Sequence, residues 1–327
     1  MKRIGNLFDK ICSLENLELA DKRARKNKTH SYGVLRHDKH QKSNLLKLHD
    51  SLINQTYKTS KYDIFKIYEP KERDIYRLPY YPDRILHHAI MNVLEPIWVS
   101  LFTKNTYNCI KHRGIHCLLK HLKYDLNDSK DVTKYCLKID IKKFYPSINH
   151  DILKGTIRKK IKDNRLLYLL DEIIDSAKGV PIGNYLSQFF ANLYLAYFDH
   201  WIKEEKHVKY YYRYADDMVF LGKSKKELHI LLKDIKIYLS KLKLTLKSNY
   251  QIFPIDTRGI DFVGYVCFHD HALLRKSIKR NMCRKAYKYK NKSKNKKEYD
   301  EALAPYWGWA KHCNSNHLMN CLEYENV

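Results

Sequence analysis

Apolar side chains recur along this chain with periods that change from helical to extended and back, and each change of period marks a predicted element. Residues 1–60 are polar and have helical spacing. Residues 61–80 alternate apolar and polar side chains around a turn near Pro70, which predicts a β-hairpin. Helical spacing returns over residues 83–123 and is interrupted by a loop at Tyr107–Gly114. The first part of the chain is therefore predicted to be helical around one hairpin.

The second part of the chain mixes the two periods more closely. In chain order, the pattern predicts a strand at Tyr135–Ile141, helices at about 149–175 and Leu186–Lys206, a hairpin at Lys209–Phe220, a helix at Lys225–Leu242, strands at Leu244–Leu246 and Ile260–Phe268, and basic helices within Arg275–Lys297. Strands and helices in this mixed order indicate an α+β fold rather than a doubly wound parallel sheet.

The charge of the chain points to a polyanionic partner. The formal net charge is +26, and such an excess repels itself strongly unless an anion neutralises it. Nucleic acid is the first candidate and an anionic membrane surface the second. The sequence shows no apolar run of membrane-spanning length, no apolar anchoring face and no signal-peptide core. We therefore expect a nucleic-acid partner, no membrane partner and a cytoplasmic location, with eight reduced cysteines that form no CxxC pair.

Carboxylates stand in two places where phosphoryl-transfer chemistry could use them. Asp140 ends the apolar strand Leu137–Ile139, and Asp216 and Asp217 lie at the tip of a tyrosine-flanked hairpin. Two divalent cations about 3.5–4 Å apart can clamp the attacking and leaving oxygens of such a reaction, and Mg²⁺ prefers carboxylate ligands. Taken alone, Asp140 is better explained as a helix N-cap, and the Asp pair is equally well explained as an ordinary turn.

Taken together, these two segments resemble motifs A and C of the reverse transcriptase family. The order of further motifs agrees. Lys71 and Arg73 lie in a segment like the fingers motifs, Gly179–Gln188 resembles motif B, and Gly259–Tyr265 resembles the primer grip of motif E. The resemblance covers about residues 60–270. It implies an RNA-directed DNA polymerase with the right-hand architecture of fingers, palm and thumb.

The resemblance also implies a division of the chain and a set of roles. The expected parts are an N-terminal helical extension at 1–60, fingers at 61–134, a palm at 135–268 with an insertion at about 149–178, and a helical thumb at 269–327. Two Mg²⁺ ions are expected on Asp140, the backbone carbonyl of Ile141, Asp216 and Asp217. The incoming dNTP is expected to contact Lys71, Arg73, Tyr145, Gly183, Ser187 and Gln188.

Two of these residues carry a more specific expectation. Tyr145 stands five residues after Asp140, where the family has an aromatic steric gate that excludes a 2′-hydroxyl, although a plain core aromatic is the alternative. Ser187 is expected to cap the helix that follows motif B.

Motif D departs from the family pattern, because Tyr250 falls where many members have a lysine. Lys247 is nearby but is expected on the opposite face of an extended chain, which leaves the general acid unassigned.

The motif B segment resembles one branch of the family in particular. Where group II intron and retroviral enzymes commonly begin with Gln-Gly, this chain has Ile182-Gly183, as in reverse transcriptases of diversity-generating retroelements. That resemblance implies copying of a template-repeat RNA into cDNA with errors at template adenines, an RNA–DNA hybrid, and an oligomeric, basic accessory variability protein. Ile182 is the expected fidelity determinant. A retron or group II-like enzyme of ordinary fidelity and a non-catalytic RNA-binding protein are the alternatives.

The basic segment near the C-terminus completes the expectations. Arg275–Lys297 holds twelve Lys and Arg residues and no acid, which favours a helix that tracks a nucleic-acid backbone over a merely solvated face. Trp307 and Trp309 are expected in the thumb core. The residues expected on nucleic acid are Lys276, Lys279, Arg280, Arg284 and Lys285.

Overall fold

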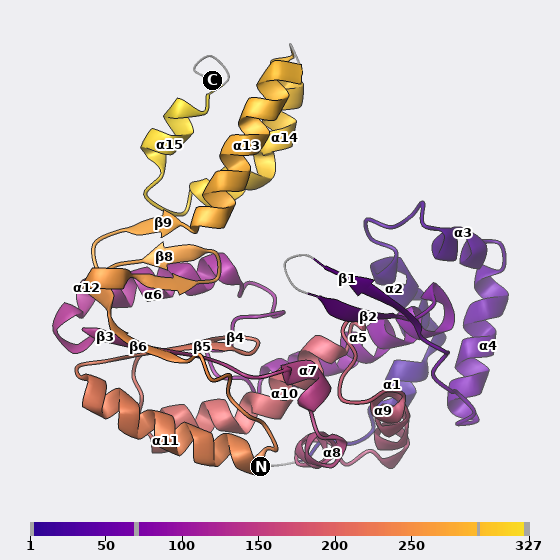
Figure 1. The fold of residues 1–327 in the computed structure, drawn as a ribbon. Coiled ribbons are helices and arrows are strands. Elements are labelled where there is room, and N and C mark those ends of the chain that lie inside the picture. Colours follow the sequence, from indigo (N-terminus) through magenta and orange to yellow (C-terminus); the bar gives the residue numbers. More distant parts are fainter. Residues whose placement is uncertain (1–2, 69–71, 293–294, 324–327) are drawn as a thin grey trace. The chain divides into compact units, whose positions relative to one another are not determined.

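The computed structural model describes residues 3–68, 72–292 and 295–323 (Figure 1). Its contacts divide the chain into two compact units. The first comprises residues 1–109, 141–207 and 236–246, and the second comprises residues 110–140, 208–235 and 247–327. Over the described ranges, no helix combines the length and the apolarity needed to cross a bilayer. The eight cysteines are all free thiols, as expected.

The first unit is mainly helical and carries one two-stranded sheet. The predicted hairpin is confirmed, because β1 pairs antiparallel with β2 and Asp63 lies opposite Arg77. The elements of this unit are α1 (Phe8–Cys12), α2 (Leu14–Ala24), α3 (Tyr32–Asp38), α4 (Gln41–Ile53), β1 (Asp63–Ile67), β2 (Arg73–Arg77), a π-helical turn (Tyr80–Arg84), α5 (Ile85–Val99), α7 (Phe144–Ser147), α8 (His150–Arg158), α9 (Asn164–Asp175), α10 (Ser187–His200) and a second π-helical turn (Trp201–Glu205).

Helices α5 and α10 supply the apolar centre of this unit. Trp98 on α5 is fully buried, and its ring lies 5.8 Å from Phe190 and 6.2 Å from Phe189 on α10. Burial of a side chain of this size contributes about 3 kcal/mol. The N-terminal extension is fastened to this unit through Asp163, which caps α9 and also accepts hydrogen bonds from the backbone of Leu7 and Phe8.

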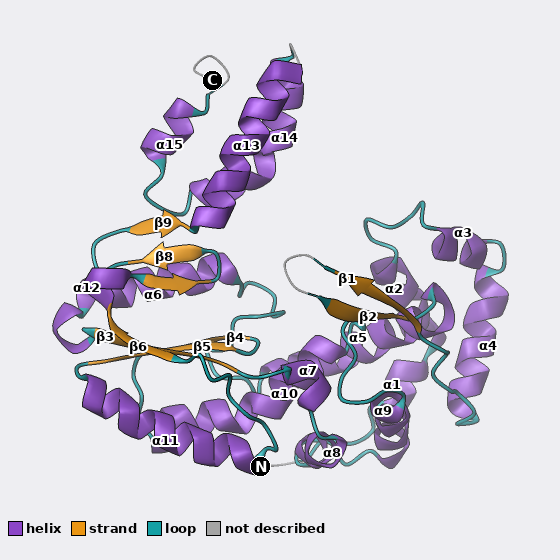
Figure 2. Ribbon diagram, viewed as in Figure 1, coloured by secondary structure: helices purple, strands orange, loops and turns teal. Residues whose placement is uncertain are grey.

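The second unit holds two antiparallel sheets, whose strands are orange in Figure 2. One has the strand order β4-β5-β3-β6 and the other the order β7-β8-β9. The elements of this unit are α6 (Ile115–Asp128), a 3₁₀ turn (Lys130–Val132), β3 (Tyr135–Asp140), β4 (Tyr211–Tyr214), β5 (Asp217–Gly222), β6 (Gln251–Pro254), α12 (Ile255–Arg258), β7 (Ile260–Phe262), β8 (Tyr265–Cys267), β9 (Ala272–Leu274), α13 (Lys276–Lys292), α14 (Lys296–Ala310) and α15 (Asn316–Cys321). Helix α11 (Lys225–Lys241) runs through both units.

Two strand predictions are wrong in their extent. At Leu244–Leu246 only Leu246 pairs, in an isolated bridge with Ile141, and strand β6 begins at Gln251 after a turn. Ile260–Phe268 is a hairpin rather than one strand, because Val263 and Gly264 both have positive φ, 42° and 92°, and the chain reverses there. The predicted primer-grip segment, Gly259–Tyr265, therefore consists of strand β7 and a tight turn.

That turn is packed against the end of α14. A Cβ built on Gly264 would lie 2.3 Å from Cζ3 of Trp309, so only glycine fits, and the Tyr265 hydroxyl donates to the Trp309 carbonyl at 3.0 Å. Trp307 packs on the buried cluster of Ala286, Tyr299 and Leu303, as expected of the thumb core. Trp309 instead fixes the β7–β8 turn to the helices that follow it.

Candidate active site

Two of the three predicted aspartates lie directly opposite one another. Asp140 is the last residue of β3 and Asp217 is the first of β5, and the antiparallel register makes them Cα partners. Their side chains therefore stand on the same face at the same end of the sheet. Asp216 precedes Asp217 in the two-residue loop between β4 and β5. All three carboxylates belong to the second unit, and the sequence spacing alone does not fix this register.

The hairpin tip is held in an unusual conformation. Ala215 has a φ of 55°, in the left-handed region that disfavours a side chain. Beneath the tip, the fully buried guanidinium of Arg213 donates to the Ala215 carbonyl at 3.2 Å. A strained residue held by a buried cation is typical of a site whose geometry is fixed before a ligand binds.

Lysines lie against both paired aspartates. Lys247 Nζ is 2.6 Å from Asp140 Oδ2, and the Lys247 backbone N–H donates to the Asp140 carbonyl at 2.9 Å. The expectation that Lys247 lies on the opposite face is therefore wrong. Residues 244–247 do not continue as a regular strand, so alternation of side chains does not apply there. Lys138 Nζ is 3.7 Å from Asp217 Oδ2.

Each paired aspartate nevertheless keeps one oxygen without a partner. Oδ1 of Asp140 and Oδ1 of Asp217 are buried and have no hydrogen-bond partner among the described residues. Burial raises the pKa of Asp217 to about 6; Lys138 opposes the rise, and the charges of Asp140 and Asp216 add to it. An anionic oxygen that is costly to bury and lacks a donor suits a cation. These residues therefore fit divalent ions.

The site as it stands is not a closed set of metal ligands. Among the described residues, no three His, Cys, Asp or Glu side chains are grouped as they would be around a metal ion. The ammonium groups of Lys138 and Lys247 lie against the carboxylates instead. The remaining expected ligand is the backbone carbonyl of Ile141, a residue that forms an antiparallel bridge with Leu246. The hydrogen bonds of that bridge are made by the neighbouring residues, from the Lys142 N–H to the Thr245 carbonyl and from the Lys247 N–H to the Asp140 carbonyl. The Ile141 carbonyl therefore takes no part in the bridge.

The motif B turn belongs to the first unit and is braced by neighbouring main chain. The Val180 N–H donates to the Tyr145 carbonyl at 2.9 Å, and the Tyr76 N–H of β2 donates to the Ile182 carbonyl at 2.8 Å. A Cβ on Gly183 would lie 2.4 Å from the Tyr76 carbonyl oxygen. The turn therefore connects β2 of the predicted fingers to Tyr145, the predicted steric gate.

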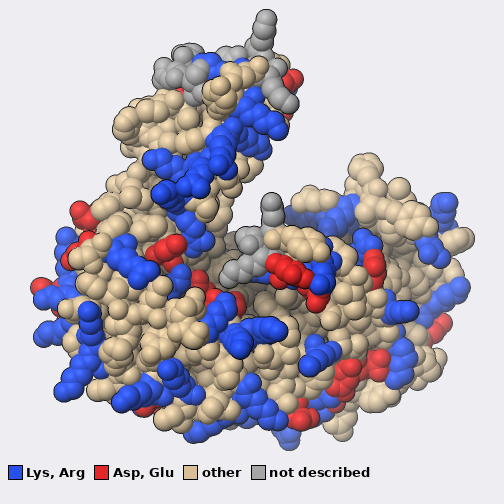
Figure 3. Space-filling model, viewed as in Figure 1, with Lys and Arg blue, Asp and Glu red and all other residues tan. Residues whose placement is uncertain are grey.

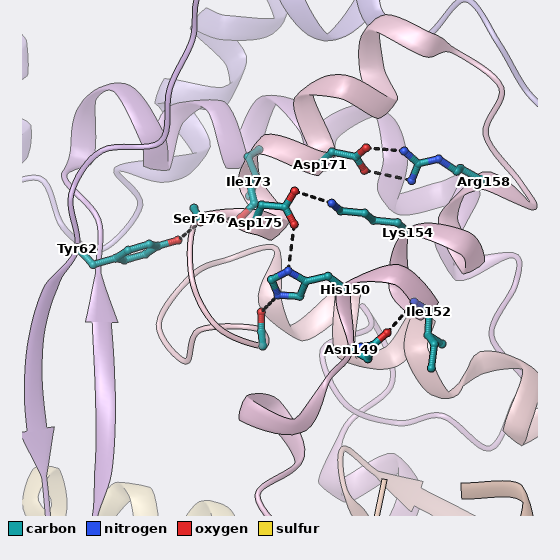
Figure 4. Close-up of polar contacts among 11 residues, drawn as sticks. Tyr62, Asn149, His150, Ile152, Lys154, Arg158, Asp171, Ile173, Asp175 and Ser176 are labelled. Carbon is teal, nitrogen blue, oxygen red and sulfur yellow. Dashed lines mark hydrogen bonds and ion pairs between the residues drawn. The ribbon is translucent and has the colours of Figure 1, made fainter. Parts of the chain in front are cut away.

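His150 adds a brace that the sequence gives no reason to expect (Figure 4). Its Nδ1 lies 3.0 Å from Asp175 Oδ1 at the end of α9, and its Nε2 lies 2.8 Å from the Gly179 carbonyl. Lys154 Nζ holds the other oxygen of Asp175 at 2.5 Å. Burial raises the pKa of Asp175, but Lys154 and His150 outweigh it and the net shift is downward. Helices α8 and α9 thereby fix the start of the motif B turn.

The other residues predicted on the nucleotide have different surroundings. Lys71 lies outside the described residues. Arg73 begins β2 and is exposed, as is Gln188, whereas Tyr145 and Ile182 are half-buried. Ser187 does not cap α10, because its hydroxyl donates to the Pro181 carbonyl at 2.6 Å and makes no cap bond. Ser187 therefore closes the motif B turn on itself.

The predicted basic surface follows α13 in the second unit (Figure 3). Exposed cations recur on this helix at intervals of three and four residues, which places them on one side. Lys285 is half-buried and its ammonium lies 5.7 Å from the centre of the Tyr289 ring. The exposed members are Lys276, Lys279, Arg280, Arg284 and Lys288. Lys288 extends the set predicted from the sequence.

Sequence reasoning overlooked three side chains, of which Lys138 and Arg213 lie by the aspartates of the second unit and His150 by the motif B turn of the first unit. Lys138 stands two residues before Asp140 in a strand, so its position on the same face could have been inferred. Arg213 is buried within a tyrosine-rich strand, which is unusual for arginine and could have been noticed only with the burial known. His150 offers no signal, because its partners lie 25 and 29 residues away.

Comparisons with known proteins give a family match that covers more than half of the chain. The family profile described as "Reverse transcriptase (RNA-dependent DNA polymerase)" matches residues 69–267. Protein YkfC of Escherichia coli (strain K12) is 25% identical over 259 residues, which cover 64% of this chain and 66% of YkfC. The group II intron-encoded protein LtrA of Lactococcus lactis subsp. cremoris is 26% identical over 140 residues, which cover 39% of this chain and 23% of LtrA. The chain thus spans just under two thirds of YkfC and about a quarter of LtrA.

Solved structures show the same fold. The apo telomerase from Candida tropicalis superimposes with a TM-score of 0.51 at 14% identity, over 66% of this chain and 48% of that one. A form of that telomerase truncated from the C-terminal domain also gives 0.51, at 16% identity, over 72% of this chain and 60% of that one. The expected α+β right-hand polymerase fold is therefore confirmed.

Proposed function

Because this chain belongs to the reverse transcriptase family, we propose that it is an RNA-directed DNA polymerase whose catalytic residues are Asp140, Asp216 and Asp217. The observation that carries the proposal is the register that sets Asp140 opposite Asp217, next to Asp216 at a hairpin tip. Template RNA, the growing cDNA and their hybrid are the proposed partners.

The three carboxylates would hold two Mg²⁺ ions, together with the Ile141 carbonyl. When bound, such ions would favour ionisation of the primer hydroxyl and neutralise the charge that develops on the phosphates. The chain's own contribution is rigidity. Paired strands fix Asp140 and Asp217, and Arg213 fixes the loop that carries Asp216. Phosphoryl transfer needs little beyond this positioning and charge.

The test is primer extension on an RNA template. The wild-type chain should add dNTPs in the presence of Mg²⁺, and Asp216→Asn should not. Asp256→Asn is the control, because Asp256 is a largely exposed carboxylate on α12 of the same unit. Template binding without extension by the wild type would favour a non-catalytic RNA-binding protein, since the basic surface would remain.

Lys247 is the residue that we propose as the proton donor to the leaving pyrophosphate, in place of Tyr250. Its ammonium lies 2.6 Å from Asp140 Oδ2, whereas Tyr250 is exposed at the turn before β6. Lys247→Met should lower the single-turnover rate about 10²-fold, within the range of general acid catalysis. Tyr250→Phe is the control. A larger loss in Tyr250→Phe than in Lys247→Met would reverse the assignment.

Tyr145 is proposed as the steric gate. The carbonyl of Tyr145 accepts a hydrogen bond from the Val180 N–H, so the main chain at this position is held beside the motif B turn. Tyr145→Ala should raise the efficiency of rNTP use relative to dNTP by about 10²-fold, because the clash with the 2′-hydroxyl disappears. The neighbouring Phe144→Leu is the control, since Phe144 is buried. The measurement is the ratio of dNTP to rNTP efficiency in the Tyr145→Ala and Phe144→Leu variants. An unchanged ratio in Tyr145→Ala would contradict the assignment of Tyr145 as the steric gate.

The lineage that we propose is that of diversity-generating retroelements. The motif B start Ile182-Gly183 supports it, and the similarity to LtrA supports the broader group II-like relationship. In this proposal the enzyme copies a template-repeat RNA with errors at adenines, and works in the cytoplasm with an oligomeric, basic accessory protein. A retron or group II-like enzyme of ordinary fidelity is the alternative, and errors spread evenly over template bases would favour it.

Ile182 is the proposed source of the low fidelity. An aliphatic side chain cannot hydrogen-bond near the nascent base pair, so correct pairs gain less over mismatches. Ile182→Gln should lower misincorporation at template adenine by roughly 5–10-fold, equivalent to about 1 kcal/mol of discrimination. Sequencing of cDNA made by both proteins measures this. Ile182→Leu is the matched control, and equal error rates in Ile182→Gln and wild type would exclude Ile182 as the determinant.

The exposed face of α13 is proposed to follow the backbone of the template–primer hybrid. Its cations are Lys276, Lys279, Arg280, Arg284 and Lys288, to which the half-buried Lys285 adds charge. Binding through phosphates is independent of sequence and weakens with added salt.

The division of the chain into extension, fingers, palm and thumb is proposed with the boundaries given above.

A further inference from the structure

We propose that Lys138 is a positioning residue that ties the catalytic Asp217 to strand β7 and, through Asp261 and Arg275, to the start of α13. The proposal rests on the proposed function, because it assigns Asp217 to catalysis. We call these four residues (Lys138, Asp217, Asp261 and Arg275) the Lys138 link. All four belong to the second unit.

The ammonium of Lys138 is shared between two acceptors. It donates a short hydrogen bond to the backbone carbonyl of Asp261 in β7, and it lies 3.7 Å from Asp217 Oδ2 in β5. Lys138 itself stands on β3, the strand between β5 and β6. One side chain therefore connects the catalytic end of the four-stranded sheet to the three-stranded sheet. A hydrogen bond from an ammonium group is stronger than one between neutral groups, so this contact contributes more than an ordinary side-chain hydrogen bond.

The link continues from β7 to Arg275, the residue that precedes α13. Arg275 Nε donates to Asp261 Oδ1 at 2.6 Å, and the Arg275 N–H donates to the Gly264 carbonyl at 2.9 Å. Arg275 thus holds both the strand and the turn of the β7–β8 hairpin. Helix α13 begins at the next residue, Lys276, and carries the exposed cations proposed to contact the hybrid.

The Lys138 contact is the more constrained half of the link. The Lys138 side chain is 23% exposed and that of Asp217 is 31% exposed, against 54% for Asp261 and 37% for Arg275. An exposed ion pair such as Arg275–Asp261 contributes little by itself. The bond from Lys138 to the Asp261 carbonyl uses main chain, so substitution of Asp261 cannot remove it. Lys138 is therefore the residue whose removal should free the hairpin from the catalytic sheet.

The physical consequence is coupling between the primer-grip turn and Asp217. Trp309 and Arg275 contact the turn at Gly264, and Lys138 contacts the strand before it at Asp261. If nucleic acid displaces the start of α13, the same ammonium transmits that displacement to the Asp217 carboxylate. The position of the bound hybrid and the position of the Asp217 carboxylate would then both depend on the Lys138 side chain.

The first test uses the metal-free protein. Lys138→Met keeps an unbranched apolar side chain one atom shorter and removes the ammonium, and Lys134→Met is the matched control, because Lys134 is exposed just before the same strand. Hydrogen exchange at the backbone amides of residues 260–266 should become at least about fivefold faster in Lys138→Met and stay unchanged in Lys134→Met. Unchanged exchange in Lys138→Met would overturn the link. This readout is independent of polymerase activity.

The second test separates positioning from a general structural role. At saturating template–primer, Lys138→Met should lower the single-turnover rate about tenfold, the loss equivalent to one charge-assisted hydrogen bond, and Arg275→Met, which removes an exposed ion pair, should lower it about threefold. Because both act through the same link, the double variant should lose little more than Lys138→Met alone. A loss of about thirtyfold in the double variant would show independent effects and overturn the proposal. An inactive wild type would instead refute the proposed function, and the exchange experiment would still decide the link.

Discussion

Replacement of Asp217 by Asn should abolish RNA-templated DNA synthesis, with a loss of about 10³-fold or more. Asn has the shape of Asp but carries no charge, so the oxygen opposite Asp140 can no longer hold a divalent ion. Metal ions contribute several kcal/mol of transition-state stabilisation, and about 4 kcal/mol corresponds to a thousandfold in rate. Single-turnover primer extension measures the loss. Asp270→Asn, which removes an exposed carboxylate of the same unit, should retain the wild-type rate.

The same variant should not be less stable in the absence of metal. The pKa of Asp217 is raised to about 6, so the folded protein binds a proton more tightly than the unfolded chain does. Metal-free stability therefore falls as pH rises from about 4 to 6, and at pH 7 the charged carboxylate costs roughly 1 kcal/mol after allowance for its partial exposure. Urea unfolding in EDTA should show Asp217→Asn equal to or above wild type at pH 7. A clearly destabilised variant would attribute the lost activity to misfolding instead.

Substitution of Gly183 by alanine should damage the motif B turn. Gly183 has a φ of 122°, which an L side chain rarely adopts, and its Cβ would lie 2.4 Å from the Tyr76 carbonyl oxygen. Backbone atoms cannot move aside cheaply, so the Tyr76–Ile182 hydrogen bond should break. We expect a loss of roughly 2–4 kcal/mol in unfolding free energy and at least a tenfold rise in KM for dNTP.

Gly155 provides the matched control in the same unit. It lies inside α8, and a Cβ there meets nothing within 4 Å. Gly155→Ala should therefore stabilise the protein by about 0.5–1 kcal/mol and leave KM unchanged. Urea unfolding and steady-state kinetics of both variants measure the contrast. Wild-type stability and KM in Gly183→Ala would show that the turn is not held as described.

The sequence predicts the elements of this protein better than their contacts. The hairpins and helices can be predicted from the spacing of apolar side chains, and the aspartates can be identified as a group from their motifs. The register of Asp140 with Asp217 cannot be predicted in this way, because it depends on how β3 and β5 pair across more than seventy residues of chain. Period-2 reasoning fails at Lys247 for a physical reason, since the chain there makes one bridge and then turns.

Local rules also fail where a segment folds back on itself. Ser187 precedes an apolar helix and so resembles a cap, but its hydroxyl is taken by Pro181 six residues earlier. Ile260–Phe268 reads as one strand because Val263 is strand-like, yet that residue adopts a positive φ beside Gly264. At Ser187 the competing contact is a local one within the turn, and at Gly264 it is the tertiary contact with Trp309; both segments are predicted to bind nucleotide or primer.

Localised cleavage by Fe²⁺ substituted for Mg²⁺ tests most directly whether the aspartates share bound cations. Hydroxyl radicals produced at the ion cut nearby main chain, and mass spectrometry identifies the cuts. We predict fragments that end near residue 140 and near residues 216–217, suppressed by excess Mg²⁺ and absent in Asp217→Asn. Cuts confined to other segments, or cuts that persist unchanged in Asp217→Asn, would contradict a cation site at the junction of β3 and β5.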